Sequence, residues 1–197
     1  MAVSTEAIKK LRSMTGAGMM DVKKALDETE GDLDKAASLL RERGIAKAAK
    51  KADRVASEGY IGNYVHHNGK IGVMVELNCE TDFVARNEQF QELARNLAMH
   101  VAMANPRYVS RDEVPEDAVK AERAELEKQA ASEGKPANVV EKIVEGRLGK
   151  FYAEICLLEQ PYIKDDKKTV DTLIKESIAT IGENIQVGRF ARIAIGE

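Results

Sequence analysis

Residues 60–84 read YIGNYVHHNGKIGVMVELNCETDFV, and this stretch decides the fold of the larger part of the chain. Tyr60–His67 and Lys70–Asn78 are rich in β-branched and aromatic residues, and Asn68-Gly69 between them is a strong signal for a β-hairpin. Further along, apolar residues recur at i, i+3, i+4 and i+7 over Phe90–Val101. The stretch therefore predicts a hairpin that is followed by an amphipathic helix.

The connection between hairpin and helix contains the tetrapeptide Thr81-Asp82-Phe83-Val84. Connections lie on protein surfaces, so we expect Phe83 to be exposed. An exposed aromatic ring can insert into a partner while the neighbouring carboxylate of Asp82 competes for a cation or a hydrogen bond. A local alternative is that Asp82 caps the next helical turn and Phe83 packs beneath that turn.

Residues 1–44 predict a three-helix, ubiquitin-associated-like bundle. Asp32 is a suitable cap for the third helix, and Gly44 is expected to end it. The adjacent Met19 and Met20 cannot both face the interior of the bundle, so we expect one of them at the surface. Methionine suits an adaptable contact there, and the alternative is a half-buried edge position for Met20.

Residues 45–57 form a basic segment in which lysine and arginine alternate with alanine. We interpret it as a linker with a solvated face. The alternative is a nucleic-acid-binding module that uses Lys47–Arg54 to neutralise phosphates, although no aromatic residues are interleaved for base stacking. The predicted division is thus a bundle at 1–44, a linker at 45–57 and an α+β core at 58–197.

The core is predicted to hold a small antiparallel sheet covered by helices. Residues 115–133 are highly charged and predict a solvent-exposed helix, which Gly134-Lys135-Pro136 should end. The next helical face is interrupted at Gly146 and Gly149. Ile185–Ile195 alternates as a strand and completes a three-stranded sheet with the hairpin. The predicted fold class is therefore α+β.

Composition limits the class of protein. Of 197 residues, 32% are charged and 44% hydrophobic, which is typical of a globular chain. The net charge of −3 gives the whole chain no signature of polyanion binding. We find neither a leader-like segment nor the ~18 apolar residues that a membrane span needs, so we expect a cytoplasmic protein. Cys79 and Cys156 are then expected to be reduced packing residues.

No catalytic constellation is recognisable. His66, His67 and His100 lack further ligands at metal-site spacing, and no Gly-Lys pair completes a phosphate-binding loop. His66 and His67 are expected on opposite faces of a strand, and Asp165-Asp166 in a polar turn. We therefore expect neither an enzyme nor a bound metal or cofactor.

Three segments together resemble the bacterial translation elongation factor Ts family. They are LRSMTGAGMMDVKKAL (11–26), LNCETDFVARN (77–87) and the region from Glu145-Gly146-Arg147 to Glu159-Gln160-Pro161-Tyr162. The resemblance implies a guanine-nucleotide exchange factor that binds elongation factor Tu and releases its GDP. It implies that Thr81–Val84 intrudes beside the partner's nucleotide site and displaces the groups that hold magnesium and phosphate. Phe83 would be the wedge and Asp82 the polar lever, while Met19 and Met20 would contact the partner's GTP-binding domain.

The resemblance also implies a short form of the family. We expect this form to lack the second half of the core and the coiled-coil insertion, so residue roles transfer least safely after about Ala104. Short forms pair into homodimers, and one small sheet with open edges gives a physical reason to do so. A peptide-binding adaptor built on the N-terminal bundle is a further alternative.

Overall fold

The structure is a computed structural model, and it describes residues 4–132 and 137–197. The chain divides into two compact units, and three strands and two helices contribute residues to both. The first unit runs up to Ile61 and adds Glu76–Leu93 and Thr172–Gln186, and the second comprises Gly62–Val75, Ala94–Asp171 and Val187–Glu197.

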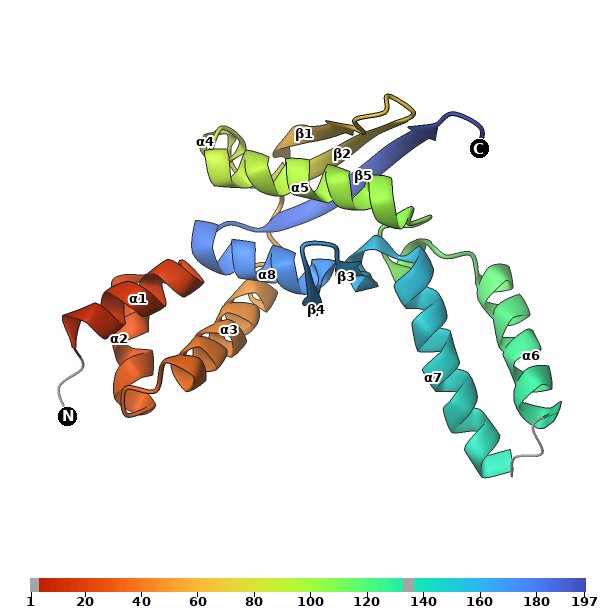
Figure 1. The fold of residues 1–197 in the computed structure, drawn as a ribbon, viewed down its shortest axis with the longest axis horizontal. Coiled ribbons are helices and arrows are strands. Elements are labelled where there is room, and N and C mark those ends of the chain that lie inside the picture. The colour runs from red at the N-terminus through yellow and green to blue at the C-terminus, as the bar shows by residue number, and fades with distance from the viewer. Residues whose placement is uncertain (1–3, 133–136) are drawn as a thin grey trace. The chain divides into compact units, whose positions relative to one another are not determined.

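Three helices form the N-terminal bundle of the first unit (Figure 1): α1 (Thr5–Thr15), α2 (Met19–Glu28) and α3 (Leu33–Ala49). Asp32 caps α3, because its carboxylate accepts hydrogen bonds from the backbone N–H groups of Asp34 and Lys35. The predicted three-helix bundle and the Asp32 cap are confirmed. Its core consists of apolar residues from all three helices, namely Leu11, Val22, Ala25, Leu26, Ala36 and Leu40.

Gly44 does not end the third helix, so that prediction is wrong. Helix α3 continues to Ala49, and Gly44 is buried within it. A Cβ atom at Gly44 would lie 3.0 Å from the Cβ atom of Ala179 in α8 (Val170–Ile181). The absence of a side chain at Gly44 therefore allows α3 and α8 to pack closely, and Gly44 does not end the helix. The domain boundaries predicted at residues 44 and 57 remain predictions.

Three strands form an antiparallel sheet in the order β1-β2-β5: β1 (Glu58–Val65), β2 (Ile71–Cys79) and β5 (Ile185–Ala194). The turn between β1 and β2 places Gly69 at φ +68°, a conformation that suits glycine. The side chain of Asn68 accepts a hydrogen bond from the Lys70 N–H group in the same turn. The predicted hairpin, the C-terminal strand and the α+β class are confirmed.

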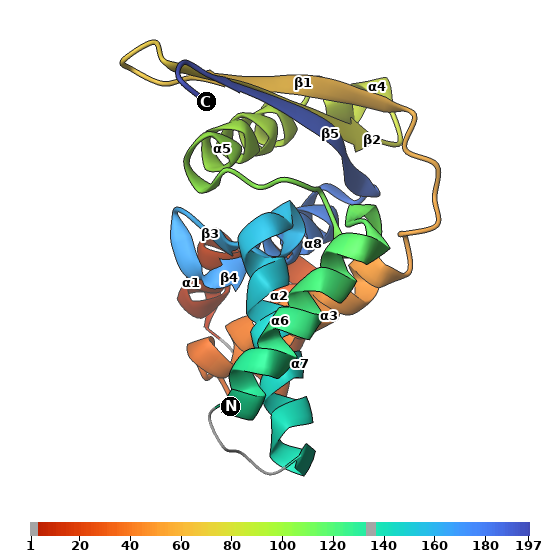
Figure 2. The same ribbon diagram turned by 90° about the vertical axis from the view of Figure 1, so that its right-hand side faces the viewer.

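Helix α5 (Glu88–Ala104) lies along one face of this sheet (Figure 2). Within the second unit, a Cβ atom at Gly62 of β1 would collide with the backbone of Ala94, so strand and helix approach closely there. The helical periodicity is confirmed, because the predicted face is buried: Phe90, Leu93, Ala94, Leu97, Ala98 and Val101. Several apolar side chains of the strands and of the residue after β5 are instead exposed in the second unit, namely Val65, Met74, Ile193 and Ile195.

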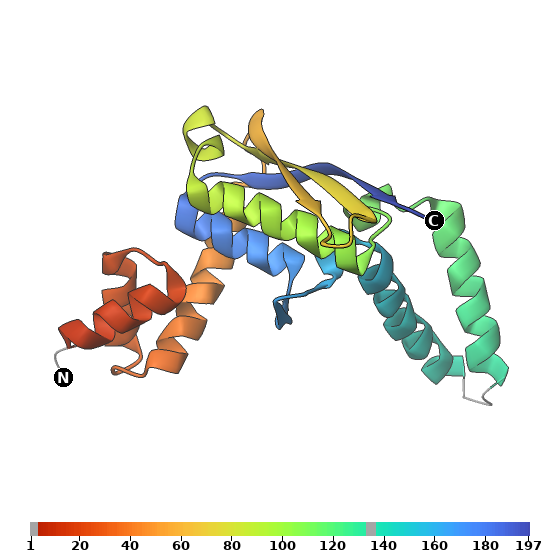
Figure 3. The ribbon, with the colours of Figure 1, turned by 45° about the horizontal axis from the view of Figure 1, so that its top comes forward.

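Two long helices of the second unit, α6 (Glu116–Ser132) and α7 (Ala137–Ile155), pack as an antiparallel pair (Figures 1 and 3). The expectation that the coiled-coil insertion of longer family members is absent remains a prediction. Helix α7 also continues through Gly146 and Gly149, against the predicted interruption, because its i to i−4 bonding does not need their side chains. The predicted break at 134–136 lies outside the described residues. The pair is joined by a small apolar core of Leu126, Ala130, Val144 and Leu148.

Short elements complete the second unit: η1 (Arg111–Glu113), η2 (Leu157–Glu159), β3 (Pro161–Tyr162) and β4 (Asp165–Thr169). Strands β3 and β4 pair antiparallel, with Asp165 opposite Tyr162. Asp165 and Asp166 thus belong to a strand, and the prediction of a polar turn at these residues is wrong. No helix in the described ranges is long and apolar enough to cross a membrane.

Candidate partner-binding site

Phe83 lies on a single helical turn, α4 (Asp82–Ala85), directly after β2. Its side chain is 81% exposed, so the predicted exposure is confirmed. The local alternative fails on both counts. Thr81, not Asp82, occupies the N-cap position, where its hydroxyl accepts a hydrogen bond from the Val84 N–H group at 3.4 Å. Phe83 points away from the protein core because the turn buries only Ala85.

Asp82 is also available at the surface. Its carboxylate forms an ion pair with Arg86, one turn later, at 2.9 Å, and both side chains are substantially exposed. Exposed pairs of this kind contribute little to stability because water competes for both charges. The carboxylate can therefore leave Arg86 for another cation or donor at small cost.

Thr81 is held from behind by the carboxylate of Glu183, which follows α8. One oxygen of Glu183 accepts hydrogen bonds from the backbone N–H groups of Glu80 and Thr81, both at 3.0 Å. The other accepts the Thr81 hydroxyl at 2.6 Å. Three donors on one carboxylate anchor the start of α4, and charged acceptors make stronger bonds than neutral ones.

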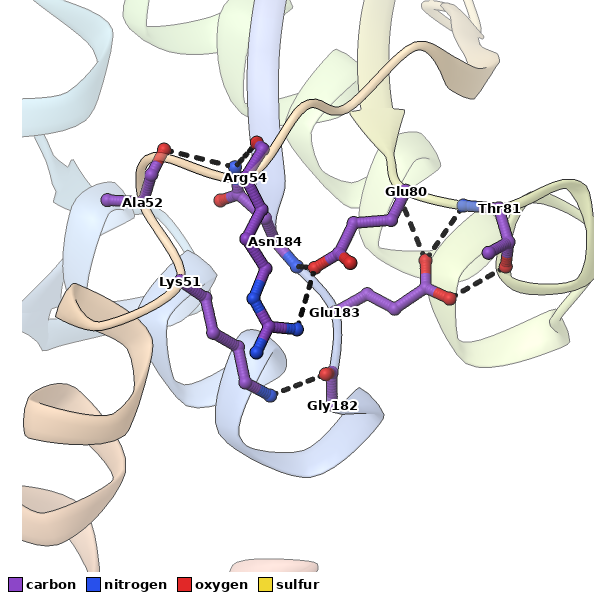
Figure 4. A network of polar contacts seen from close by, with 8 residues as sticks. All are labelled: Lys51, Ala52, Arg54, Glu80, Thr81, Gly182, Glu183 and Asn184. Carbon is purple, nitrogen blue, oxygen red and sulfur yellow. Dashed lines mark hydrogen bonds and ion pairs between the residues drawn. The ribbon is translucent and has the colours of Figure 1, made fainter.

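A second set of contacts joins Glu80, in the segment before α4, to Asn184 and Arg54 (Figure 4). The carboxylate of Glu80 accepts the Asn184 N–H group at 2.7 Å and meets Arg54 at 3.5 Å. Asn184 is buried, and its side-chain amide donates to the backbone carbonyls of Ala52 and Arg54 at 3.2 and 2.7 Å. Segments 52–54, 80–81 and 183–184 are thus joined within the first unit.

Cys79 supports the same loop from the buried side. Its Sγ donates to the Thr81 carbonyl at 3.2 Å. Burial raises the pKa of the Cys79 thiol to about 11, so the thiol is neutral near pH 7. The residue packs and donates a weak hydrogen bond, and it is not poised for nucleophilic chemistry.

Met19 and Met20 are both exposed, by 57% and 67%, where we expected only one at the surface. They form the first turn of α2, ahead of the buried position Val22, so neither reaches the bundle core. The half-buried alternative for Met20 is therefore wrong. These methionines and Phe83 lie on separate elements, α2 and α4.

The sequence profile described as Elongation factor TS matches residues 3–197. The chain belongs to this family. It is 58% identical to Elongation factor Ts of Oleidesulfovibrio alaskensis, over 99% of this chain and 98% of that protein. It is 58% identical to Elongation factor Ts of Solidesulfovibrio magneticus over 100% and 98% of the two chains, and 57% identical to that of Acetivibrio thermocellus over 99% and 91%. This elongation factor Ts family member thus has a role in translation elongation.

Basic side chains of residues 45–57 make several contacts within the protein. Lys47 pairs with Asp21 at 2.8 Å, and this hydrogen bond lowers the pKa of the Asp21 carboxyl. Lys51 donates to the Gly182 carbonyl, and Arg54 pairs with Glu80. These contacts take up side chains that the nucleic-acid alternative needs for phosphates, so that alternative loses support.

Among residues 4–132 and 137–197, no group of three or more His, Cys, Asp or Glu side chains is arranged to hold a metal ion. His66 and His67 follow the end of β1 and lie in the turn, where their ring centroids are 4.2 Å apart. The expectation that they occupy opposite faces of a strand is therefore wrong. Because both residues lie after the end of the strand, their side chains need not point to opposite faces of the sheet.

Sequence reasoning missed Glu183. It is separated from Thr81 by 102 residues, and Gly182-Glu183-Asn184 looks like an ordinary turn between a helix and a strand. No local pattern shows which distant backbone N–H groups a turn carboxylate accepts. Only the pairing of β5 with β2 brings the two segments together.

Proposed function

We propose that this family member is a guanine-nucleotide exchange factor, which binds GDP-bound elongation factor Tu and promotes GDP release. The observation that carries the proposal is the 81% exposure of Phe83 on a turn that begins next to Glu80 and Thr81, which donate three hydrogen bonds to Glu183. In this proposal Phe83 inserts beside the partner's nucleotide site. Asp82 competes with the groups that hold magnesium and phosphate, and Thr81 and Val84 maintain the loop.

The physical basis of exchange is linkage between two binding equilibria. A protein that binds the nucleotide-free partner more tightly than the GDP-bound partner must weaken GDP affinity by the same factor. This action requires no bond chemistry and no nucleotide site or cofactor on the exchange factor itself. The release of GDP is faster because groups that hold it are displaced.

Met19 and Met20 are proposed to contact the GTP-binding domain of elongation factor Tu regardless of the bound nucleotide. Two adjacent exposed methionines give an adaptable apolar contact. Met20→Asp should raise the half-saturating concentration of the factor by about tenfold and leave the plateau rate unchanged. The reason is that the substitution removes an apolar contact that would be buried in the complex with elongation factor Tu. Met103→Asp, at another exposed methionine, is the matched control and should behave as wild type.

A homodimer is proposed through the sheet of the second unit. The supporting observation is the exposure of Val65, Met74, Ile193 and Ile195 on or beside the strands, together with the positions of β1 and β5 at the two edges of the sheet. Apolar patches and open strand edges are features that proteins cover, and a second copy presents the same surface by symmetry.

The test of the exchange function is the release of a fluorescent GDP from purified elongation factor Tu, chased with unlabelled GDP. Added factor should accelerate release by more than about tenfold, a change that a lost network of phosphate contacts readily produces. Release at the uncatalysed rate would contradict the proposal.

Filter binding of tRNA at physiological salt tests the nucleic-acid alternative. That alternative predicts that the protein retains tRNA on the filter and that Lys47→Glu weakens this retention.

A further inference from the structure

Thr81 has every polar group engaged within the protein. Its N–H group and hydroxyl donate to Glu183, and its carbonyl accepts from Cys79. The same hydroxyl oxygen accepts from the Val84 N–H group. Because the hydroxyl proton points to the carboxylate, the oxygen lone pairs are left for Val84, and hydrogen bonds in such a chain reinforce one another.

Helix α4 is too short to fix its own orientation. It has four residues and buries only Ala85, whereas isolated helices need about 12–15 residues to be even marginally stable in water. The direction of Phe83 therefore depends on how the turn is attached at Thr81. The attachment is made by Glu183, which stands on the segment between α8 and β5.

Glu183 is itself fixed by its neighbours. The adjacent Asn184 is 1% exposed and binds the carbonyls of Ala52 and Arg54, while its N–H group binds Glu80 (Figure 4). The Gly182 carbonyl accepts from Lys51. The carboxylate that holds the loop is thus mounted on a braced turn, which is the arrangement that keeps a binding group preorganised.

We propose that Glu183 is a positioning residue for nucleotide exchange. Its carboxylate holds the Thr81–Val84 turn in the orientation that presents Phe83 to the partner. The inference rests on the proposed exchange function and deepens it, because it assigns a residue outside the loop to the same step. Glu183 orients only the loop, and the other surfaces that bind elongation factor Tu do not depend on it. Loss of Glu183 should therefore lower the rate of GDP release more than the affinity of the factor for elongation factor Tu.

The first test measures GDP release as a function of factor concentration for Glu183→Gln and Glu183→Ala. The amide of glutamine has one acceptor oxygen and carries no charge, so it cannot serve all three donors. We expect the plateau rate to fall about five- to tenfold while the half-saturating concentration changes less than about twofold. Glu176→Gln, which removes a carboxylate of α8 that pairs with Arg41, is the matched control and should retain the wild-type plateau.

A double-mutant cycle tests whether Glu183 acts through Phe83. In a Phe83→Ala background, Glu183→Ala should reduce the plateau by less than about twofold, because the group that it positions is gone. A general loss of stability would instead reduce both backgrounds equally. Equal reductions would overturn the positioning role.

Amide hydrogen exchange provides a readout that does not depend on elongation factor Tu or on any variant. The Glu80 and Thr81 N–H groups of the free wild-type protein should exchange at least about tenfold more slowly than unprotected amides. Full exposure of these amides would overturn the inference even if Glu183 variants fail to fold. Wild-type protein that does not stimulate GDP release would overturn the proposed function and the role of Glu183 with it. Stimulation by wild type with an unchanged plateau in both Glu183 variants would overturn the positioning role alone.

Discussion

Adjacent positions in the Thr81–Val84 loop have opposite environments. Thr81 has its backbone and hydroxyl groups bound by Glu183, Cys79 and Val84, while Phe83 leaves four-fifths of its side chain in water. Burial of apolar surface stabilises a fold, so an exposed phenylalanine contributes little to the free energy of folding. A firmly held backbone that carries a free aromatic ring is suited to insertion into another protein.

Phe83→Ala should slow stimulated GDP release by about tenfold or more, because a large aromatic anchor is lost from the proposed interface. The thermal unfolding midpoint should stay within about 2 °C, since a change of 1 kcal/mol corresponds to a few degrees in a chain of this size. Stopped-flow fluorescence of labelled GDP and a thermal melt check the two parts. Val55→Ala, at an apolar residue that is 80% exposed outside the loop, is the control. A wild-type rate in folded Phe83→Ala would exclude the wedge role.

Helices α3 and α7 each contain glycine in their interior, and the surroundings of these glycines differ. Gly44 of α3 lies against Ala179, whereas a Cβ atom at Gly146 of α7 would meet nothing within 4 Å. Glycine weakens a helix through its backbone entropy wherever it stands. Packing between elements therefore explains the glycine in α3, and nothing in the structure explains the one in α7.

The same substitution at these two glycines should have opposite effects. Gly146→Leu should stabilise the protein by about 0.5–1 kcal/mol through helix propensity. Gly44→Leu should destabilise it by about 1–3 kcal/mol, because the added side chain overpacks the contact between α3 and α8. Urea denaturation followed by circular dichroism measures both. A gain in stability at Gly44 would show that the contact with Ala179 is loose.

At the scale of the whole molecule, the sheet of the second unit has two different sides. One side packs on α5, while Val65, Met74, Ile193 and Ile195 remain in water. Large exposed apolar patches mark interaction surfaces in many proteins. This uneven burial is the physical support for a second copy of the chain.

Ile193→Lys should raise the dissociation constant of the proposed homodimer by at least about tenfold, because the change places a charge in the proposed apolar interface. Sedimentation equilibrium at several loading concentrations measures the shift. Ile163→Lys, at a residue that is 42% exposed between β3 and β4, is the control and should leave association unchanged. A monomeric wild type would contradict the dimer.

Stability of the whole fold should fall as the pH drops below about 6.5. His100 is fully buried, with Nε2 2.9 Å from Oε1 of Gln160 and Nδ1 accepting from the Ile163 N–H group. Burial lowers its pKa from the ordinary value of 6.5. Between that value and the lowered pKa, the unfolded chain binds a proton that the folded chain does not, so acidification favours unfolding.

Urea denaturation of wild type and His100→Gln at pH 7.0 and pH 5.5 checks this linkage. The unfolding free energy of wild type should fall between these values, and that of the variant should fall less. Carboxyl groups such as Asp21, with a pKa lowered from 3.8, titrate below this range. Parallel changes in the two proteins would assign the pH dependence to other groups.

Much of the fold follows from local patterns. The hairpin at Asn68-Gly69, the α5 periodicity and the Asp32 cap depend on residues close in sequence, and each is confirmed. Wrong predictions arose where a local signal competed with a distant contact. Gly44 was interpreted as a stop because a stop needs only a glycine, whereas its packing partner Ala179 is far along the chain.

The features of the candidate site also fall into two groups, those that local sequence predicts and those that depend on distant contacts. The exposure of Phe83 and the family were determined by the sequence alone, because a connection between strand and helix and three continuous motifs are local features. Only the tertiary structure decided what holds the loop. Glu183 meets Thr81 because β5 pairs beside β2, and the hydrogen bonds of a carboxylate depend on spatial neighbours that its sequence position does not reveal.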